Sequence, residues 1–375
     1  MEFSLDSLQP KERASFALRA LYEAAGCRKY HMGRFEEYGL YQENRSFLSS
    51  EQVITFTDLD GRLLALKPDV TLSIAKNLGG GPEAAPEKLY YDESVYRAPD
   101  SGLGFQEITQ AGLEYLGRVD GYVMGEVAML AARSLEEISE GWVLDLSHMG
   151  YLTGLVDELG LRGPERAELL RAVGSRSVQA VLAVCSSAGA PMSAAERLAS
   201  LLELYGPAQE LLPRLRAGAA TAAELAAVEE LEGTARVLES FGCLGGVNID
   251  LSITCDTEYY NGLVFKGYVP GAPSAVLSGG RYDSLMRKLG KEEQAIGFAV
   301  YLNLLERLGG PEPEYDADVL LIPDGETPEQ LAGAVRELTD SGRSVRVQPG
   351  GCSGLRCRAV MKMLDGRPVE LERND

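Results

Sequence analysis

The spacing of apolar and polar positions predicts the secondary structure of roughly the first 145 residues. Near the start, apolar residues recur at helical spacing and predict an amphipathic helix: Phe16, Leu18, Leu21 and Tyr22. The segment "QVITFTDLDGRLLALKPDVT" alternates on both sides of Asp60 and Gly61, which predicts a hairpin that turns at these two residues. Two further predicted strands follow, "KLYYDESVYRAP" and "FQEITQAGLEYLG", joined by the loop "APDSGLG".

The pattern then changes twice along the chain. Residues 150–242 are rich in Ala, Leu and Glu with helical periodicity, which predicts a helical insert. Strands return between Val247 and Leu277, and "AIGFAVYLNLLERL" predicts an apolar helix. After a linker, "GGPEPEYDA", the chain begins strand, helix, strand and continues with roughly one more helix and one more strand.

Strands that are grouped in hairpins, rather than alternating regularly with helices, predict an antiparallel sheet. We therefore expect an α+β fold in which helices flank this sheet. The expected core spans residues 1–312 and contains the helical insert at 150–242. A small α/β unit is expected over residues 313–375.

Composition and charge narrow the classes of function. The formal net charge of −20, without a local basic stripe, argues against nucleic acid as a partner. No apolar run is long enough to span a membrane, no signal pattern opens the chain, and the six cysteines are scattered. We expect a cytoplasmic protein with reduced thiols and no membrane association. The chain has only two histidines, His31 and His148, which are too few for a typical histidine-based metal site, and we expect no bound metal.

Several polar residues are candidates for ligand binding. In "LKPDVT", Asp69 and Thr71 on one strand face would suit an ammonium group, or Asp69 caps a helix that follows. Arg97 at a strand end would suit a carboxylate or phosphate, or it forms a surface salt bridge. Gln110 and Glu114 share a strand face, and turning both inward is costly without a polar ligand.

Gly112 lies between Gln110 and Glu114 and would leave room for such a ligand. In "ITCDTEYYNGLVF", Tyr259 and Tyr260 precede a turn and suggest another wall of a pocket. A cation to hold an anionic ligand is missing from this stretch, which carries Cys255 and two acidic residues instead. The stretch therefore raises the question of a site kept for binding after its chemistry was lost.

Five segments in this order resemble the class II aminoacyl-tRNA synthetase core, specifically the histidyl-tRNA synthetase lineage. They are "LKPDVT", "VYRAPDSGLGFQEITQAGLE", "EYYNGLVF", "GGRYDSL" and "AIGFAVYLNLL". The resemblance covers residues 10–310, interrupted by the helical insert, and it implies the same fold. The tail resembles the beginning of that family's anticodon-binding domain and is expected to be truncated.

The departures from the lineage concern cations. The family's last helix carries an arginine that holds the ATP phosphates, where this chain has Asn303 and Leu304. The family carries further basic residues after its second motif, where this chain has Gln106. In the family, Arg-Gly-Leu-Asp precedes the paired tyrosines, and in this chain residues 255–258 take its place. Because positioned cations stabilise the charge that develops during adenylate formation, the resemblance implies no catalytic residues here.

The amino-acid pocket of the family is retained. By resemblance, Asp69, Thr71 and Gln110 would hold an α-amino group, Glu114 with a tyrosine would bind an imidazole, and Arg97 would face a carboxylate. This combination resembles the regulatory subunits of ATP phosphoribosyltransferase, as do the aspartate of "KPDVT", the segment "GLVFKGYVPG" and the acidic charge. The expected ligand is L-histidine, with no cofactor.

The resemblance also implies partners. The family partner is the short catalytic subunit of ATP phosphoribosyltransferase, in the first step of L-histidine biosynthesis. Gly33 stands where class II enzymes carry an interface proline, but Phe35 and Tyr38 remain to be buried. We expect a homodimer within a hetero-octamer. The alternatives are an active histidyl-tRNA synthetase or related ligase, and a histidine sensor for some other partner.

Overall fold

A computed structural model gives the fold of the protein. The model divides the chain into two compact units, one spanning Leu8–Leu308 and one formed by the described residues from 315 on. None of the helices in the described residues is long and apolar enough to cross a membrane. The structure describes residues 8–48, 52–77, 85–98, 104–253, 259–308, 315–350 and 354–374.

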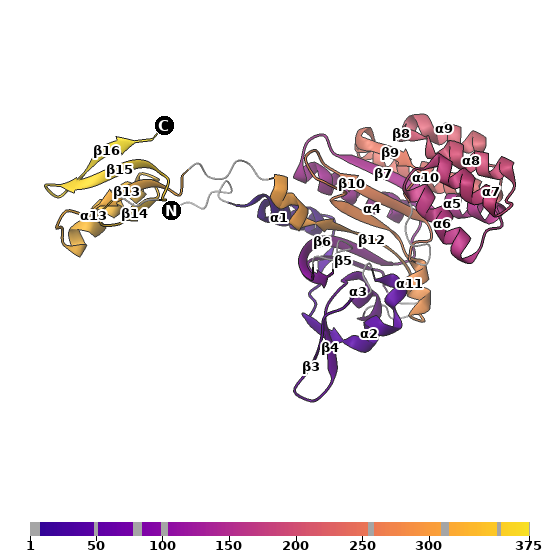
Figure 1. Ribbon diagram of the computed structural model, residues 1–375, viewed down its shortest axis with the longest axis horizontal. Coiled ribbons are helices and arrows are strands. Elements are labelled where there is room, and N and C mark those ends of the chain that lie inside the picture. The colour runs from indigo at the N-terminus through magenta and orange to yellow at the C-terminus, as the bar shows by residue number, and fades with distance from the viewer. Residues whose placement is uncertain are drawn as a thin grey trace. The chain divides into compact units, whose positions relative to one another are not determined.

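A nine-stranded sheet organises the larger unit (Figure 1). Two neighbouring pairs in it, β1 with β5 and β7 with β9, are parallel, and the other neighbours are antiparallel. The predicted antiparallel α+β fold is therefore confirmed. In spatial order the strands are β1 (Arg28–Lys29), β5 (Glu87–Arg97), β6 (Gln106–Gly117), β12 (Gln294–Tyr301), β11 (Leu277–Arg281), β10 (Leu263–Tyr268), β7 (Val143–His148), β9 (Val247–Asp250) and β8 (Tyr205–Pro207).

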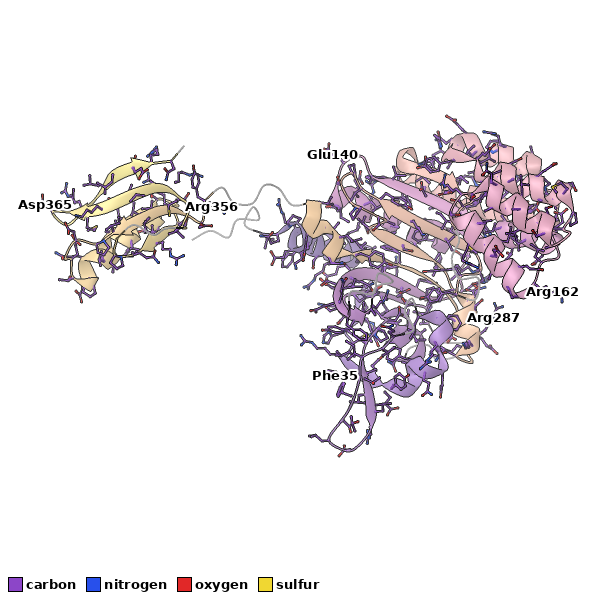
Figure 2. All side chains as sticks on the ribbon, viewed as in Figure 1. Phe35, Glu140, Arg162, Arg287, Arg356 and Asp365 are labelled. Carbon is purple, nitrogen blue, oxygen red and sulfur yellow. The ribbon has the colours of Figure 1, made fainter. Side chains whose placement is uncertain are left out.

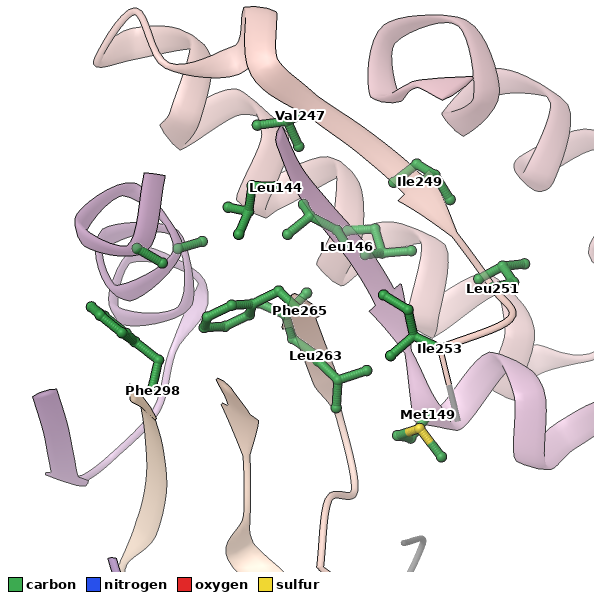
Figure 3. Close-up of a cluster of buried hydrophobic side chains, with 14 of the residues drawn as sticks. Leu144, Leu146, Met149, Val247, Ile249, Leu251, Ile253, Leu263, Phe265 and Phe298 are labelled. Carbon is green, nitrogen blue, oxygen red and sulfur yellow. The ribbon is translucent and has the colours of Figure 1, made fainter. Parts of the chain in front are cut away.

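One face of this sheet is covered by helices and holds the main hydrophobic core. Apolar side chains of β7, β9, β10 and β12 gather there (Figure 3) and pack with four helices. These helices are α1 (Pro10–Ala24), α4 (Gly121–Ile138), α10 (Ala222–Ser240) and α12 (Leu302–Leu305). The predicted amphipathic helix is α1, in which Leu18 and Tyr22 are buried. Phe16 was expected on the same apolar stripe, but it is 59% exposed.

The other face carries smaller elements. Three helices lie there, α2 (Tyr38–Glu43), α3 (Thr71–Asn77) and α11 (Asp283–Lys288). Beside them is a three-stranded antiparallel sheet of β2 (Phe35–Glu37), β4 (Leu63–Leu66) and β3 (Thr55–Thr57). The predicted hairpin is β3–β4, and it projects from the unit in Figure 1. Phe35, labelled in Figure 2, lies on this small sheet.

The predicted helical insert lies between β7 and β9. It ends with α10 and begins with α5 (Met149–Glu158), and the short edge strand β8 interrupts its series of helices. Arg162 in Figure 2 lies just before its second helix. The helices between the first and the last are α6 (Gly163–Gly174), α7 (Val178–Ser187), α8 (Met192–Leu202) and α9 (Ala208–Gly218).

One predicted helix is wrong. The first half of "AIGFAVYLNLLERL" forms the buried central strand β12, and only Leu302–Leu305 is α-helical. The run is apolar almost throughout, because a central strand is buried on both faces. Such a run carries no period that separates a strand from a buried helix. Two of its residues, Gly297 and Ala299, also line the pocket described below.

The smaller unit begins as the sequence predicts, with β13 (Ala317–Ile322), α13 (Pro328–Asp340) and β14 (Val345–Val347). The helix begins with a capping box between Thr327 and Gln330. The further helix expected after β14 is absent from the described residues. Instead β15 (Cys357–Leu364) pairs in parallel with β13 and turns directly into an antiparallel β16 (Arg367–Arg373).

Candidate functional site

A cavity of about 300 Å³ opens beside the sheet, where β5, β6, β11 and β12 meet the start of α3. All seven residues singled out in the sequence line it, although they come from four separate segments. The lining also includes aromatic residues that the sequence did not single out, among them Phe47, Tyr91, Tyr282 and Tyr301. The seven predicted residues are Asp69, Thr71, Arg97, Gln110, Glu114, Tyr259 and Tyr260.

Glu114 lies at the floor of the cavity and is 1% exposed. The Thr71 hydroxyl donates to its Oε1 at 2.6 Å, and the Tyr282 hydroxyl donates to its Oε2 at 2.6 Å. Burial raises the pKa of Glu114 to about 8, although the two hydrogen bonds act to lower it. At neutral pH the cavity therefore holds a carboxyl group that is largely protonated.

The neighbouring strand makes room for this carboxyl group. Glu114 on β6 is paired with Gly297 on β12, and a Cβ at Gly297 would lie 1.8 Å from Glu114 Oε2. Since atoms cannot approach so closely, only glycine at this position lets Glu114 turn into the cavity. The Gly297–Glu114 pair fixes where the carboxyl group stands.

Asp69 and Arg97 form an ion pair at the side of the cavity. Arg97 Nη2 lies 3.0 Å from Asp69 Oδ2, and its Nε donates to the Pro68 carbonyl at 2.6 Å. The pair is largely buried, so the surface salt bridge considered for Arg97 is wrong. Asp69 and Thr71 do not share a strand face, because α3 begins at Thr71; the alternative, in which Asp69 caps this helix, is confirmed, since Asp69 Oδ1 accepts from the Leu72 amide at 2.8 Å.

Gln110 faces the cavity from β6 and is 3% exposed. Within the described part of the chain, its side-chain amide has no hydrogen-bond partner. The Gln110 amide is not among the fully enclosed polar atoms without a partner, so it opens onto the cavity and can bond a molecule that enters it. A polar ligand in the cavity would supply the missing hydrogen bonds, which supports the binding role that the sequence suggested.

Tyrosine rings form the opposite wall. The rings of Tyr259 and Tyr260 lie 4.5 Å apart, and Tyr259 also lies 6.0 Å from Tyr282 and 5.8 Å from Phe47. The sequence predicted that Gly112 would leave room for a ligand, and this prediction is wrong. The space beside Gly112 is occupied by the Tyr91 ring, which would lie 2.4 Å from a Cβ at this position. Tyr91 fills that space and presents its side chain to the cavity.

The charges around the cavity suit a small zwitterion better than a nucleotide. Arg97 is the single cation of its described lining, and it is already paired with Asp69. Leu304 packs against the core on α12, and Gln106 is exposed at the start of β6. The replaced segment 255–258 lies outside the described residues. In the part of the chain that is described, no cluster of side chains could hold a metal ion.

Comparison with known proteins agrees with this fold. A family model described as histidyl-tRNA synthetase matches residues 6–305. The ATP phosphoribosyltransferase regulatory subunit of Symbiobacterium thermophilum is 34% identical over 79% of this chain and 76% of its own length. A solved ATP phosphoribosyltransferase regulatory subunit/histidyl-tRNA synthetase from Bacillus halodurans has a TM-score of 0.73 at 26% identity, covering 92% of this chain and 90% of its own.

A second solved structure, the ATP phosphoribosyl transferase (HisG:HisZ) complex from Thermotoga maritima, has a similar fold. Its matching chain has a TM-score of 0.60 at 20% identity and covers 78% of this chain and 97% of its own. The fold and the pocket define a class II aminoacyl-tRNA synthetase-like protein without the cations of adenylation. The chain belongs to the histidyl-tRNA synthetase family and, within it, to the regulatory subunits of ATP phosphoribosyltransferase, which are non-catalytic paralogues.

Proposed function

We propose that the chain activates the short catalytic subunit of ATP phosphoribosyltransferase in histidine biosynthesis and that its cavity binds L-histidine as a feedback signal. The relatives' names support the first part, since they are regulatory subunits over about four-fifths of the chain. The observation that carries the second part is Gln110, an amide buried in the cavity whose described surroundings offer it no partner.

Each end of histidine has a matching group in the cavity. The α-amino group would lie among Asp69, Thr71 and Gln110, and the imidazole would meet Glu114 and a tyrosine. The α-carboxylate would face Arg97, whose Nε and Nη2 are already engaged. This arrangement binds a zwitterion by hydrogen bonds and leaves the triphosphate of ATP without a matching cluster of cations.

The proposal includes an assembly. We expect a homodimer through the edge that carries Phe35 and Tyr38, within a hetero-octamer with the catalytic subunit. Phe35 is 55% exposed, and its ring lies 5.1 Å from the ring of Phe56, which is also exposed. Two neighbouring exposed aromatic rings are typical of an interaction surface. The free, buried cysteines among the described residues support a cytoplasmic location.

Calorimetric titration of the full chain with L-histidine tests the cavity. Glu114→Ala should weaken binding roughly tenfold to a hundredfold, because it removes a buried hydrogen-bond partner of the imidazole. Glu107→Ala is the matched control, since Glu107 lies on the same strand and is exposed. If the two variants bind L-histidine with equal affinity, histidine does not bind in this cavity.

Co-expression with the short catalytic subunit tests the regulation. The histidine concentration that halves ATP phosphoribosyltransferase activity should rise in Glu114→Ala by the same factor as the dissociation constant, because effector and partner are linked. If this midpoint is unchanged, the histidine sensor lies on the catalytic subunit. The chain would then act as a scaffold and activator.

A further inference from the structure

A polar network runs past the ends of strands β7 and β11, between the helical insert and the cavity. Its first member is Glu230, in the middle of α10 and 35% exposed. The His148 ring, at the end of β7, lies with Nε2 2.9 Å from Glu230 Oε2. The Gly150 amide donates to His148 Nδ1 at 3.1 Å, so the ring proton is on Nε2 and is donated to Glu230.

The second carboxylate oxygen of Glu230 faces Arg281 at the end of β11. Arg281 Nη1 lies 3.7 Å from Glu230 Oε1, and Arg281 Nε donates to Asp283 Oδ2 at 2.8 Å. The two ion pairs share one guanidinium group that is 14% exposed. Arg281 therefore links a helix of the insert to the first turn of α11.

Asp283 extends the network to the paired tyrosines. Its Oδ2 lies 3.3 Å from Asn261 Nδ2, and its backbone amide donates to Asn261 Oδ1 at 2.9 Å. The Asn261 amide in turn donates to the Arg281 carbonyl at 3.1 Å. Asn261 directly follows Tyr259 and Tyr260 in the chain, so these contacts fix the end of the segment that forms the tyrosine wall.

The same network holds Tyr282, the residue between Arg281 and Asp283. The Tyr282 hydroxyl donates to Glu114 inside the cavity, while the side chains on both sides of it belong to the network. Gly262 leaves the space for Arg281, since a Cβ there would lie 3.0 Å from the arginine Cδ. The tyrosine wall and Tyr282 are thus held in place by side chains that do not themselves line the cavity.

We propose that Glu230 of the helical insert is a positioning residue for the cavity, acting through Arg281, Asp283 and Asn261 on the tyrosine wall and on Tyr282. This inference rests on the proposed function in taking L-histidine as the ligand. Because coupling is reciprocal, a partner that moves α10 alters histidine affinity, and histidine alters the stability of α10. The insert is thereby the element that carries the ligand signal out of the cavity.

A readout without ligand tests the network itself. Amide hydrogen exchange is measured on the full chain for wild type, Glu230→Gln and Glu229→Gln. Glu229 is the matched control, because it precedes Glu230 on α10, is 66% exposed and lies 3.9 Å from Arg216. We expect Glu230→Gln to speed exchange at Asn261 and Asp283 by about twofold to thirtyfold over the control, the range found for couplings of this kind.

The exchange of distant amides separates positioning from general loss of stability. Exchange in α4 should be the same in Glu230→Gln and Glu229→Gln. Faster exchange everywhere, or identical exchange at Asn261 and Asp283 in the two variants, would overturn the proposal. If Glu230→Gln does not fold, Arg281→Met takes its place, because a methionine forms an ion pair with neither Glu230 nor Asp283.

Titration with L-histidine then distinguishes this inference from the proposed function. Histidine should bind Glu230→Gln about twofold to thirtyfold more weakly than Glu229→Gln, and it should slow exchange around residue 230 of the wild type. Unchanged affinity in Glu230→Gln would overturn the coupling. If the wild type binds no histidine while Asn261 and Asp283 still respond to Glu230→Gln, the proposed ligand is wrong and the positioning network stands.

Discussion

At the scale of single residues, Glu114 controls the electrostatics of the cavity. A carboxyl group that is buried beside Asp69 keeps its proton well above its ordinary pKa of 4.5, up to about 8. The proton has a consequence for folding. Between these two pH values the folded chain holds a proton that the unfolded chain has released, so the free energy of unfolding falls as pH rises.

Glu114→Gln should remove this dependence, because a neutral amide does not titrate; its oxygen can accept from one of the two hydroxyls, Thr71 or Tyr282, and its NH2 group can donate to the other. We expect the free energy of unfolding of the variant, relative to that of the wild type, to increase by up to about 1.4 kcal/mol for each pH unit between 4.5 and 8. Urea unfolding at several pH values measures this. A stability difference that is constant across the window would mean that Glu114 is ionised in the folded chain.

The same proton predicts how histidine binding depends on pH. Between about 6.5, the ordinary pKa of an imidazole, and about 8, the free carboxyl group carries a proton and the free ligand ring does not. In the complex, the Glu114 carboxyl group and the imidazole ring share one proton. Between these two pH values Glu114 already carries that proton, so binding neither takes up nor releases a proton. Affinity should therefore be highest and flat there, and should fall on both sides.

Calorimetry in two buffers of different ionisation enthalpy checks this proton count. At pH 7 the two buffers should give the same binding enthalpy for the wild type. Glu114→Gln provides the contrast, because above pH 8 its affinity should fall only as the α-ammonium group of the ligand loses its proton, and therefore less steeply than that of the wild type. A buffer-dependent enthalpy for the wild type at pH 7 would contradict the shared proton.

The polar residues that line the cavity could be predicted from the sequence. A buried glutamine and glutamate on one strand face are costly without a ligand, and this cost made Gln110 and Glu114 visible in the sequence. Tyr91 and Tyr282 were missed, because an isolated tyrosine in a strand or before a helix is equally typical of a core. Gly112 was misassigned for the related reason that a sequence does not show which neighbour occupies the space a glycine leaves.

At the scale of elements, amphipathic segments were predicted correctly and uniformly apolar ones were not. One side of α1 is exposed and the other is buried, which imposes a helical period on its sequence, and the β3–β4 hairpin is marked by its Asp60–Gly61 turn. Strands β5 and β6 are largely buried, but polar residues interrupt their apolar runs. The central strand β12 has no such interruption, and it was mistaken for a helix. The β15–β16 hairpin was missed in part because β16 is mostly exposed and lacks apolar alternation.

The helical insert contains a buried ion pair whose cost can be measured. Glu224 on α10 is fully buried, and Arg197 on α8 bonds both of its carboxylate oxygens, at 3.0 and 2.8 Å. Arg197→Met would leave this carboxylate without its cation, and we expect the free energy of unfolding to fall by about 3 kcal/mol. Arg166→Met is the control, with a loss below about 1 kcal/mol, because Asp157 is exposed.

Urea denaturation of the two variants gives the comparison. Adding Glu224→Leu to Arg197→Met should restore part of the loss, because the stranded charge is then gone. A loss in Arg197→Met as small as that in Arg166→Met would show that water or another cation reaches Glu224.

At the scale of the whole molecule, exposed aromatic rings predict self-association. The Phe35–Phe56 pair lies on the three-stranded sheet of the larger unit. If this surface forms the proposed homodimer, replacing both phenylalanines with serine should give monomers in sedimentation at micromolar concentration. Phe241→Ser, at a ring that is 40% exposed at the end of α10, should leave the dimer intact. A wild type that is monomeric without its partner would contradict the dimer.

The whole molecule also predicts an absence of adenylation. Adenylate formation needs cations around the α-phosphate, and each positioned donor contributes about 3–4 kcal/mol. Here Leu304 packs into the core, Gln106 is neutral, and Arg97 is paired with Asp69. We expect no histidine-dependent ATP–pyrophosphate exchange from the purified chain. Leu304→Arg should not create it, because one buried arginine replaces neither Gln106 nor the missing Arg of segment 255–258. Exchange at synthetase-like rates in the wild type would overturn the regulatory assignment.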